Sequence, residues 1–263
     1  MYLKVLIIVS ILIIFLLSFY YMEFYKIYFI KKDIEVFLIN LDYRKDRLER
    51  FKRTYNLKNI KCSLVKAVDA KKLDIEKLKK NNLIGNYGLK TLKIDKRTHH
   101  HQFNTVGAIG CYMSHIKTWQ KILKSKCKYG LIFEDDIEFN NYMTEDIICN
   151  YISNLPNNWD ILLLSKNRVT MYKIKNNLYK VKKFICLHSY IVNKNSIPKM
   201  IKNITPINQQ IDFQLSCLAN QDILNVYLFN DLNNKFFYKQ YYSNTNIQTT
   251  TIKGASWDLN CKI

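Results

Sequence analysis

Residues 129–136 read YGLIFEDD, an apolar run that ends in three consecutive carboxylates. The apolar part has the length and composition of a buried β-strand. Adjacent carboxylates at the end of a strand repel one another unless a cation lies among them. Mg²⁺ and Mn²⁺ favour carboxylate and water ligands and often bridge to the phosphate oxygens of a substrate. The pattern therefore indicates either a metal site or a solvated acidic turn.

Within this acidic cluster, Glu134 and Asp136 are the predicted metal ligands. Residues two apart point to the same side of an extended chain, so these two carboxylates would converge if the strand geometry persists. The position agrees with a ligand site, since ligands of open α/β sheets bind outside the carboxyl ends of the strands.

The segments around this strand alternate between strand-like and helix-like patterns. This alternation predicts an α/β sheet whose strands are at least partly parallel. We expect strands over residues 35–41, 60–68, 159–164 and 184–192, and helices over 42–53, 73–80, 106–125 and 197–204.

Two neighbouring segments, residues 81–105 and 106–125, contain further candidates for functional residues. Residues 81–105 show no clear period and predict a long surface loop, in which the His99-His100-His101 run would be mobile. On the helix over 106–125, a core-facing stripe is expected at Tyr112, Ile116, Trp119 and Leu123, with a more polar stripe at Cys111, Ser114, His115 and Thr118.

The N-terminus contains an apolar segment, VLIIVSILIIFLLSFYY over residues 5–21, with no charged residue. This length nearly spans the hydrocarbon core of a bilayer. A cleaved signal peptide is the alternative, but small residues should then follow, whereas aromatic residues typical of a membrane interface follow here. We expect an uncleaved signal-anchor helix within residues 1–31 and a single catalytic domain over 32–263. The lysines on either side leave a lumenal and a cytosolic location of that domain open.

The composition of the chain limits the classes of partner that it can bind. The chain has 263 residues, is 48% apolar and carries a formal net charge of +20, from 41 Lys+Arg and 21 Asp+Glu. The apolar content excludes disorder as the main state. The basic excess could serve nucleic acid, an anionic membrane or a phosphate-bearing ligand, or could reflect the bias of an AT-rich genome. No nucleic-acid recognition motif accompanies the basic excess, so no nucleic-acid partner is expected.

The cysteines show no metal-binding or redox motif. The seven cysteines are dispersed and include no CxxC pair, which argues against zinc ribbons and thioredoxin-like redox motifs.

Four segments, in this order, resemble the signature segments of glycosyltransferase family 25. They are VFLINLDYRKDRLERF (36–51), GAIGCYMSH (107–115) with Trp119, LIFEDDI (131–137) and WDILLL (159–164). The family includes bacterial lipooligosaccharide galactosyltransferases and collagen galactosyltransferases, and the likeness runs from about residue 34 to at least residue 215. It implies a GT-A-type, Rossmann-like nucleotide-sugar-binding domain. It also implies transfer of a hexose, galactose first, from a UDP-sugar to a hydroxyl of a glycan or protein, with inversion and with Mn²⁺ or Mg²⁺.

By this resemblance, several residues acquire expected roles. Those expected at the donor and its diphosphate are Asn40, Arg44, Arg47, Ser114, His115, Asp135 and His188. Arg44 and Arg47 could instead be a solvated helix face, and His115 and His188 could be packing residues. Asp136 is expected to act in catalysis through the metal. An inverting reaction also needs a base on the opposite face of the sugar, and Asp212 is the candidate.

A second class of function stays open at this point. A catalytically inactive membrane protein could keep the same fold and bind glycans or anionic partners. The intact acidic cluster favours the enzyme.

Overall fold

The computed structural model describes residues 2–139, 143–165, 168–230, 238–240, 251–256 and 261. Its centre is a mixed eight-stranded sheet in the order β2-β1-β4-β9-β6-β10-β8-β7. The strands are β1 (Ile34–Asn40), β2 (Cys62–Lys66), β4 (Tyr129–Glu134), β6 (Ile161–Leu163), β7 (Thr170–Lys175), β8 (Leu178–Lys183), β9 (Ser189–Asn193) and β10 (Val226–Phe229). β1 is parallel to both β2 and β4, and β6 is parallel to β10, whereas β9 is antiparallel to β4 and β6. The prediction of a partly parallel α/β sheet is confirmed.

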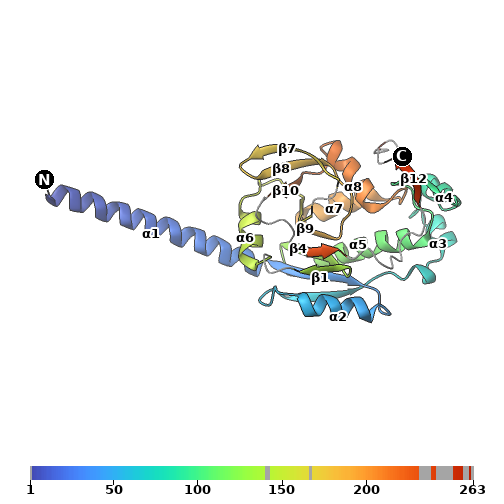
Figure 1. Ribbon diagram of the computed structural model, residues 1–263, viewed down its shortest axis with the longest axis horizontal. Helices are drawn as coiled ribbons and strands as arrows, with labels where there is room; N and C mark the ends of the chain where they lie inside the picture. The colour runs from blue at the N-terminus through green and yellow to red at the C-terminus, as the bar shows by residue number, and fades with distance from the viewer. Residues whose placement is uncertain are drawn as a thin grey trace.

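Helices cover both faces of the sheet. All seven residues of β1 are buried, and they alternate between two apolar cores: Phe37 and Ile39 face one, Val36 and Leu38 the other. The first core includes residues of α5 (Val106–Lys124), α7 (Ile197–Ile204) and α8 (Ile211–Asn220), and the second includes residues of α2 (Lys45–Thr54) and α6 (Glu145–Ser153). Figure 1 shows α2 on the opposite side of β1 from α5. This two-sided burial explains why the strands are almost continuously apolar.

Shorter elements complete the described part of the chain. They are α3 (Ile75–Lys80), α4 (Asn86–Thr91), β3 (Arg97–His99), β5 (Ile137–Phe139), β11 (Tyr238–Gln240), β12 (Thr251–Ser256) and two 3₁₀ turns at Ala70–Lys72 and Lys194–Ser196. β5 pairs with β11, and β3 pairs with β12. A disulfide joins Cys217 of α8 to Cys261, and the other five cysteines are free thiols.

The N-terminal helix α1 (Tyr2–Lys32) extends away from the sheet domain (Figure 1). Its segment from Val5 to Lys32 is long and apolar enough to cross a membrane by length and composition, with a mean hydropathy of 2.7 in its most apolar window, none of which is buried against the protein. The last turns of α1 contact the domain: Ile27 and Ile30 pack on the core beside α6, and Lys31 pairs with Glu145.

The prediction of a surface loop over 81–105 is wrong. This region contains α4 and β3, and Ile84 forms a bridge with Ile207. His101 is 2% exposed and shares a hydrogen bond with the Tyr87 hydroxyl at 2.8 Å, so the expected mobility of the histidine run does not hold for it. The apolar residues that anchor the segment, Ile84 and Phe103, are too far apart in sequence to show a period.

Two further expectations are corrected. The expected core stripe of α5 does not extend to Leu123, which is 37% exposed, whereas Ser114, His115 and Thr118 of the more polar stripe are buried. The strand expected over 184–192 begins only at Ser189, and His188 lies just before it. The helices expected over 42–53 and 197–204 are present as α2 and α7.

Candidate active site

A cleft lies at the carboxyl ends of the parallel strands. From β1 the chain passes through α2 to β2 on one side, and it later reaches β4 on the other side of β1. Strand order therefore reverses beside β1, which is where open α/β sheets bind ligands. A cleft of about 410 Å³ opens there. Six of the predicted site residues line it: Arg47, Ser114, His115, Glu134, Asp135 and Asp136.

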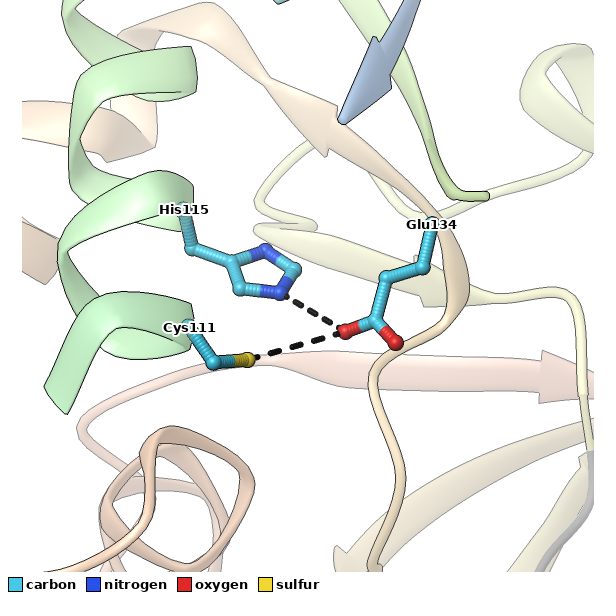
Figure 2. Close-up of side chains that lie close together, drawn as sticks. All are labelled: Cys111, His115 and Glu134. Atoms are coloured by element: carbon cyan, nitrogen blue, oxygen red, sulfur yellow. Dashed lines mark hydrogen bonds and ion pairs between the residues drawn. The ribbon is translucent and has the colours of Figure 1, made fainter. Parts of the chain in front are cut away.

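Glu134, the last residue of β4, points toward two side chains of α5 (Figure 2). His115 Nε2 lies 3.1 Å from Glu134 Oε1, and Cys111 Sγ lies 3.9 Å from the same oxygen. The second carboxylate oxygen points away from both (Figure 2). Burial alone would raise the pKa of Glu134, but the hydrogen bond from His115 and the positive charge of Arg47 hold that pKa below its usual value.

His115 is itself oriented by buried groups. Its Nδ1 lies 3.0 Å from the hydroxyl of Tyr190 in β9, and Trp119 Nε1–H donates to the same hydroxyl at 2.8 Å. Because Glu134 is ionised, Nε2 carries the ring proton and donates it to the carboxylate, and Nδ1 then accepts from Tyr190. Trp119, Tyr190, His115 and Glu134 thus form a hydrogen-bond chain in which each member has a partner.

Asp135 also lines the cleft, and both of its carboxylate oxygens accept hydrogen bonds from other side chains. Arg47 Nη1 donates to its Oδ1 at 2.8 Å, and Asn40 Nδ2 donates to its Oδ2 at 2.7 Å. Burial raises the pKa of Asp135, and these two donors partly oppose that effect. Asp135 therefore fixes Arg47 beside the cleft, which brings together three residues predicted from the sequence for the donor site.

Ser114 joins α5 to the segment after β2. The backbone N–H of Val68 donates to Ser114 Oγ at 2.8 Å, and Ser114 Oγ donates to the carbonyl of Gly110 at 2.6 Å. The hydroxyl is thus engaged within the protein. Ser114 shapes the wall of the cleft by holding Val68 against α5.

Four of the predicted site residues are not among the described residues that line the cleft: Asn40, Arg44, His188 and Asp212. Arg44 pairs with Asp46 at 2.8 Å at the start of α2. His188 is 4% exposed, and its backbone carbonyl accepts the N–H of Glu134 at 3.0 Å. Burial lowers the pKa of His188 to about 4, only partly opposed by the charge of Glu134. His188 is therefore neutral near pH 7.

Asp212 lies in the first turn of α8. Its Oδ2 accepts the N–H of Cys186 at 2.8 Å, and its Oδ1 accepts the N–H of Phe213 at 2.9 Å. Burial raises its pKa, the two N–H groups oppose this, and repulsion from Glu134 raises it further. Asp212 is therefore near enough to Glu134 to sense its charge.

Four residues near the site were not predicted from the sequence. Cys111, Trp119 and Tyr190 belong to the hydrogen-bonded group around Glu134. The fourth is the buried Arg97, whose positive charge is attracted by Asp212. The four-residue spacing of Cys111 and His115 was visible in the sequence. Their common target, Glu134 on another element, was not.

The residues present suit a hard divalent cation. Glu134 directs one oxygen away from α5, and Asp136 lines the same cleft. Carboxylate oxygens are the ligands that Mg²⁺ and Mn²⁺ prefer. Asp135, held by Arg47 and Asn40, is the least available of the three.

Comparisons with known proteins assign the chain to a family. A family model described as glycosyltransferase family 25 (LPS biosynthesis protein) matches residues 33–215, so the chain belongs to glycosyltransferase family 25. It is similar to procollagen galactosyltransferase 1-A of Xenopus laevis, with 33% identity over 137 residues, 51% of this chain and 21% of that protein. It is also similar to human procollagen galactosyltransferase 2, with 28% identity over 137 residues, again 51% and 21%.

The match to these relatives is partial. The chain spans about a fifth of the length of the curated relatives it matches. Among solved structures, a Drosophila galactosyltransferase 7 mutant in complex with manganese, UDP-Gal and xylobiose aligns with 80% of this chain and 71% of that chain, at 11% identity and a TM-score of 0.38.

Proposed function

We propose that this chain is a metal-dependent glycosyltransferase with a GT-A-type domain, which moves galactose from a UDP-sugar to a hydroxyl of a glycan or protein. The observation that carries the proposal is the placement of Glu134 and Asp136 in a cleft at the strand-order reversal, with Arg47 beside them. Membership in family 25 and similarity to proteins named procollagen galactosyltransferases support the reaction and the sugar.

The proposed binding of the nucleotide-sugar donor rests on the charges of the cleft. Glu134 and Asp136 would hold Mn²⁺ or Mg²⁺, which when bound neutralises charge on a departing diphosphate. Arg47, fixed by Asp135 and Asn40, contributes a permanent positive charge at the same wall. Ser114 shapes the wall of this donor site by holding the Val68 segment. Arg44, next to α2, and His188, whose carbonyl holds the backbone of Glu134, would support the site from outside its lining.

The acceptor side needs a base. Asp212 is the proposed base, because it comes from a different element than the metal ligands and because burial raises the pKa of its carboxyl, which makes it a stronger proton acceptor than a solvated aspartate. Removal of the acceptor proton opposite the leaving group gives inversion at the sugar.

We also propose that the chain is anchored in a membrane. Residues 1–31 would anchor the chain in a bilayer through α1, and residues 32–263 would form the catalytic domain.

The decisive experiment is a screen of UDP-sugars with Mn²⁺, read by UDP release from the full chain in detergent. We expect UDP-galactose to give the highest rate and EDTA to abolish it. Asp136→Ala should lower kcat at least a hundredfold, because the metal loses a ligand. Asp146→Ala, at an exposed carboxylate of α6, is the matched control and should keep turnover. Full turnover by Asp136→Ala would contradict the metal assignment, and absence of UDP release with every donor would favour the inactive alternative.

A further experiment separates the base from the donor site. Asp212→Asn keeps the shape of the side chain and one of the two backbone hydrogen bonds, since an amide has a single acceptor oxygen. It cannot accept a proton, so we expect kcat for transfer to fall by about 10²–10⁴-fold. UDP binding, measured by calorimetry, should stay within a factor of three of the unmodified protein. Transfer at an unchanged rate would remove Asp212 from the mechanism.

A further inference from the structure

A thiol lies inside the cleft, close to the proposed donor metal, and the proposed reaction does not use it. Cys111 and His115 are one turn apart on α5 and point toward the same carboxylate, Glu134 (Figure 2). Their ligand atoms and the Glu134 oxygen all lie within 4.8 Å of one another. Cys111 also lines the cleft, so an ion could reach the group from solvent.

The spacing of the three ligand atoms fits a small tetrahedral ion. Zinc bonds of about 2.0–2.3 Å place nitrogen and oxygen ligands about 3.4 Å apart, and sulfur and oxygen ligands about 3.6 Å apart. The observed separations are 3.1 Å for His115 Nε2 to Glu134 Oε1 and 3.9 Å for Cys111 Sγ to the same oxygen. Shifts of a few tenths of an ångström would complete one face of the tetrahedron, and the cleft side is open to a water as the fourth ligand.

Neighbouring groups already orient these ligands. When a metal binds Nε2 of His115, the ring proton resides on Nδ1 instead. A metal-bound imidazole usually donates this other N–H to an oxygen, and the Tyr190 hydroxyl lies 3.0 Å from Nδ1. The backbone N–H of Glu134 donates to the carbonyl of His188, which holds the end of β4 in place. Such support is typical of a pre-organised site rather than of three side chains that meet by chance.

We propose that Cys111, His115 and Glu134 form a binding site for a thiophilic divalent cation of the Zn²⁺ class, distinct in chemistry from the hard-ion site. One sulfur and one imidazole nitrogen select Zn²⁺ or Co²⁺ over Mg²⁺, Mn²⁺ and Ca²⁺, which prefer oxygen. Because Glu134 belongs to both sites, and two divalent cations on one carboxylate repel each other, an ion in one site weakens binding in the other. On the proposed function, a thiophilic ion is therefore an inhibitor that acts from within the donor site.

The test uses Co²⁺ as a coloured substitute for Zn²⁺, added to the full chain in detergent. A thiolate ligand gives Co²⁺ a near-ultraviolet sulfur-to-metal charge-transfer band, which histidine or carboxylate ligands alone do not give. We expect this band to saturate at one equivalent of Co²⁺ and to disappear when Zn²⁺ is added. Binding of Co²⁺ without the band, or the absence of binding at micromolar Co²⁺, would overturn the proposal.

Variants identify the thiol. Cys111→Ser should abolish the band, and His115→Gln should weaken Co²⁺ binding at least tenfold. Cys62→Ser, at an exposed thiol of β2, is the matched control and should leave the band unchanged. Thermal unfolding shows whether each variant folds, and Cys111→Ala replaces Cys111→Ser if the latter does not. A band that survives Cys111→Ser, or that is lost in Cys62→Ser, would contradict the assignment.

Inhibition by Zn²⁺ is measured independently of the Co²⁺ spectra. Zn²⁺ at micromolar concentration should lower Mn²⁺-supported UDP release at least tenfold, and Zn²⁺ that binds without inhibiting would contradict the sharing of Glu134. If no donor yields UDP, the proposed function fails, while the Co²⁺ band still decides the cation site.

Discussion

Individual side chains of the cleft are positioned by partners outside it. Glu134 is oriented by His115, which is oriented by Tyr190, whose hydroxyl also accepts from Trp119. Arg47 is held by Asp135. Such support reduces the reorganisation needed when a charged ligand binds, because donors and charges are already in place.

Tyr190→Phe tests this hydrogen-bond chain. The substitution removes one hydroxyl and leaves buried groups of Trp119 and His115 without their partner. We expect the free energy of unfolding to fall by about 1–3 kcal/mol, measured by urea denaturation. Tyr227→Phe, at another buried ring, is the control and should change stability by less than about 0.5 kcal/mol. Equal effects of the two variants would show that the chain of hydrogen bonds contributes nothing specific.

His188 should make stability depend on pH. Its pKa is about 4 in the folded state and near 6.5 in the unfolded chain, so the unfolded state takes up the proton first as pH falls. The free energy of unfolding should therefore decrease between pH 6.5 and pH 4, by up to about 3 kcal/mol. His188→Gln should flatten this decrease in a series of urea titrations.

The control for His188 is the same series from pH 7 to pH 9. His188 is neutral in both states there, so the difference between the variant and the unmodified protein should be constant. A difference that is also constant from pH 6.5 to pH 4 would show that His188 titrates normally in the folded protein.

Among the helices, α5 contributes most to the cleft. It carries Cys111, Ser114 and His115, and it packs against the segment after β2 through Gly110. A Cβ at Gly110 would lie 2.9 Å from the carbonyl oxygen of Val68, a backbone atom that cannot rotate away. The close approach of α5 to this segment therefore depends on the absence of a side chain.

Gly110→Ala should push α5 away from the Val68 segment. We expect a loss of about 1–3 kcal/mol in unfolding free energy, typical of overpacking, measured by urea denaturation. The helix propensity of alanine acts in the opposite direction by up to about 1 kcal/mol. Gln120→Ala, exposed on the same helix, is the control and should change stability by less than about 0.5 kcal/mol. A stabilised Gly110→Ala protein would show that the segment yields without cost.

The molecule as a whole joins a long apolar helix to an α/β domain. The end of α1 is attached to α6, where Glu145 pairs with Lys31 and accepts from the backbone and side-chain N–H groups of Asn59. The attachment gives the domain a defined starting position relative to α1. It also places the last turns of α1 against the protein rather than in lipid.

Charges placed in the middle of α1 should weaken membrane binding. Each arginine at the centre of a spanning helix costs about 2.5–3.5 kcal/mol. The double substitution Leu12→Arg and Phe15→Arg should lower the fraction of chain that floats with liposomes at least tenfold. Leu12→Ala with Phe15→Ala is the control and should still float. Flotation that is unaffected by the two arginines would show that the membrane proposal is wrong.

Much of this protein could be predicted from local patterns. Apolar runs and helical periodicity depend on near neighbours, so they predicted the mixed sheet, α2, α7 and the apolar N-terminal helix. Motifs in order predicted the family, and the acidic residues after β4 predicted the place of the cleft at the edge of the sheet. The packed segment at 81–105 could not be predicted, because its contacts, such as Ile84 with Ile207 and Tyr87 with His101, show no period in the sequence.

Only the tertiary structure decided which partners each of the three carboxylates contacts. Glu134, Asp135 and Asp136 are equivalent in the sequence. In the fold, Asp135 is taken by Arg47 and Asn40, Glu134 meets His115 and Cys111, and Asp136 lines the cleft. Charge, hydrogen bonding and burial depend on partners from distant segments, and folding alone brings those partners together.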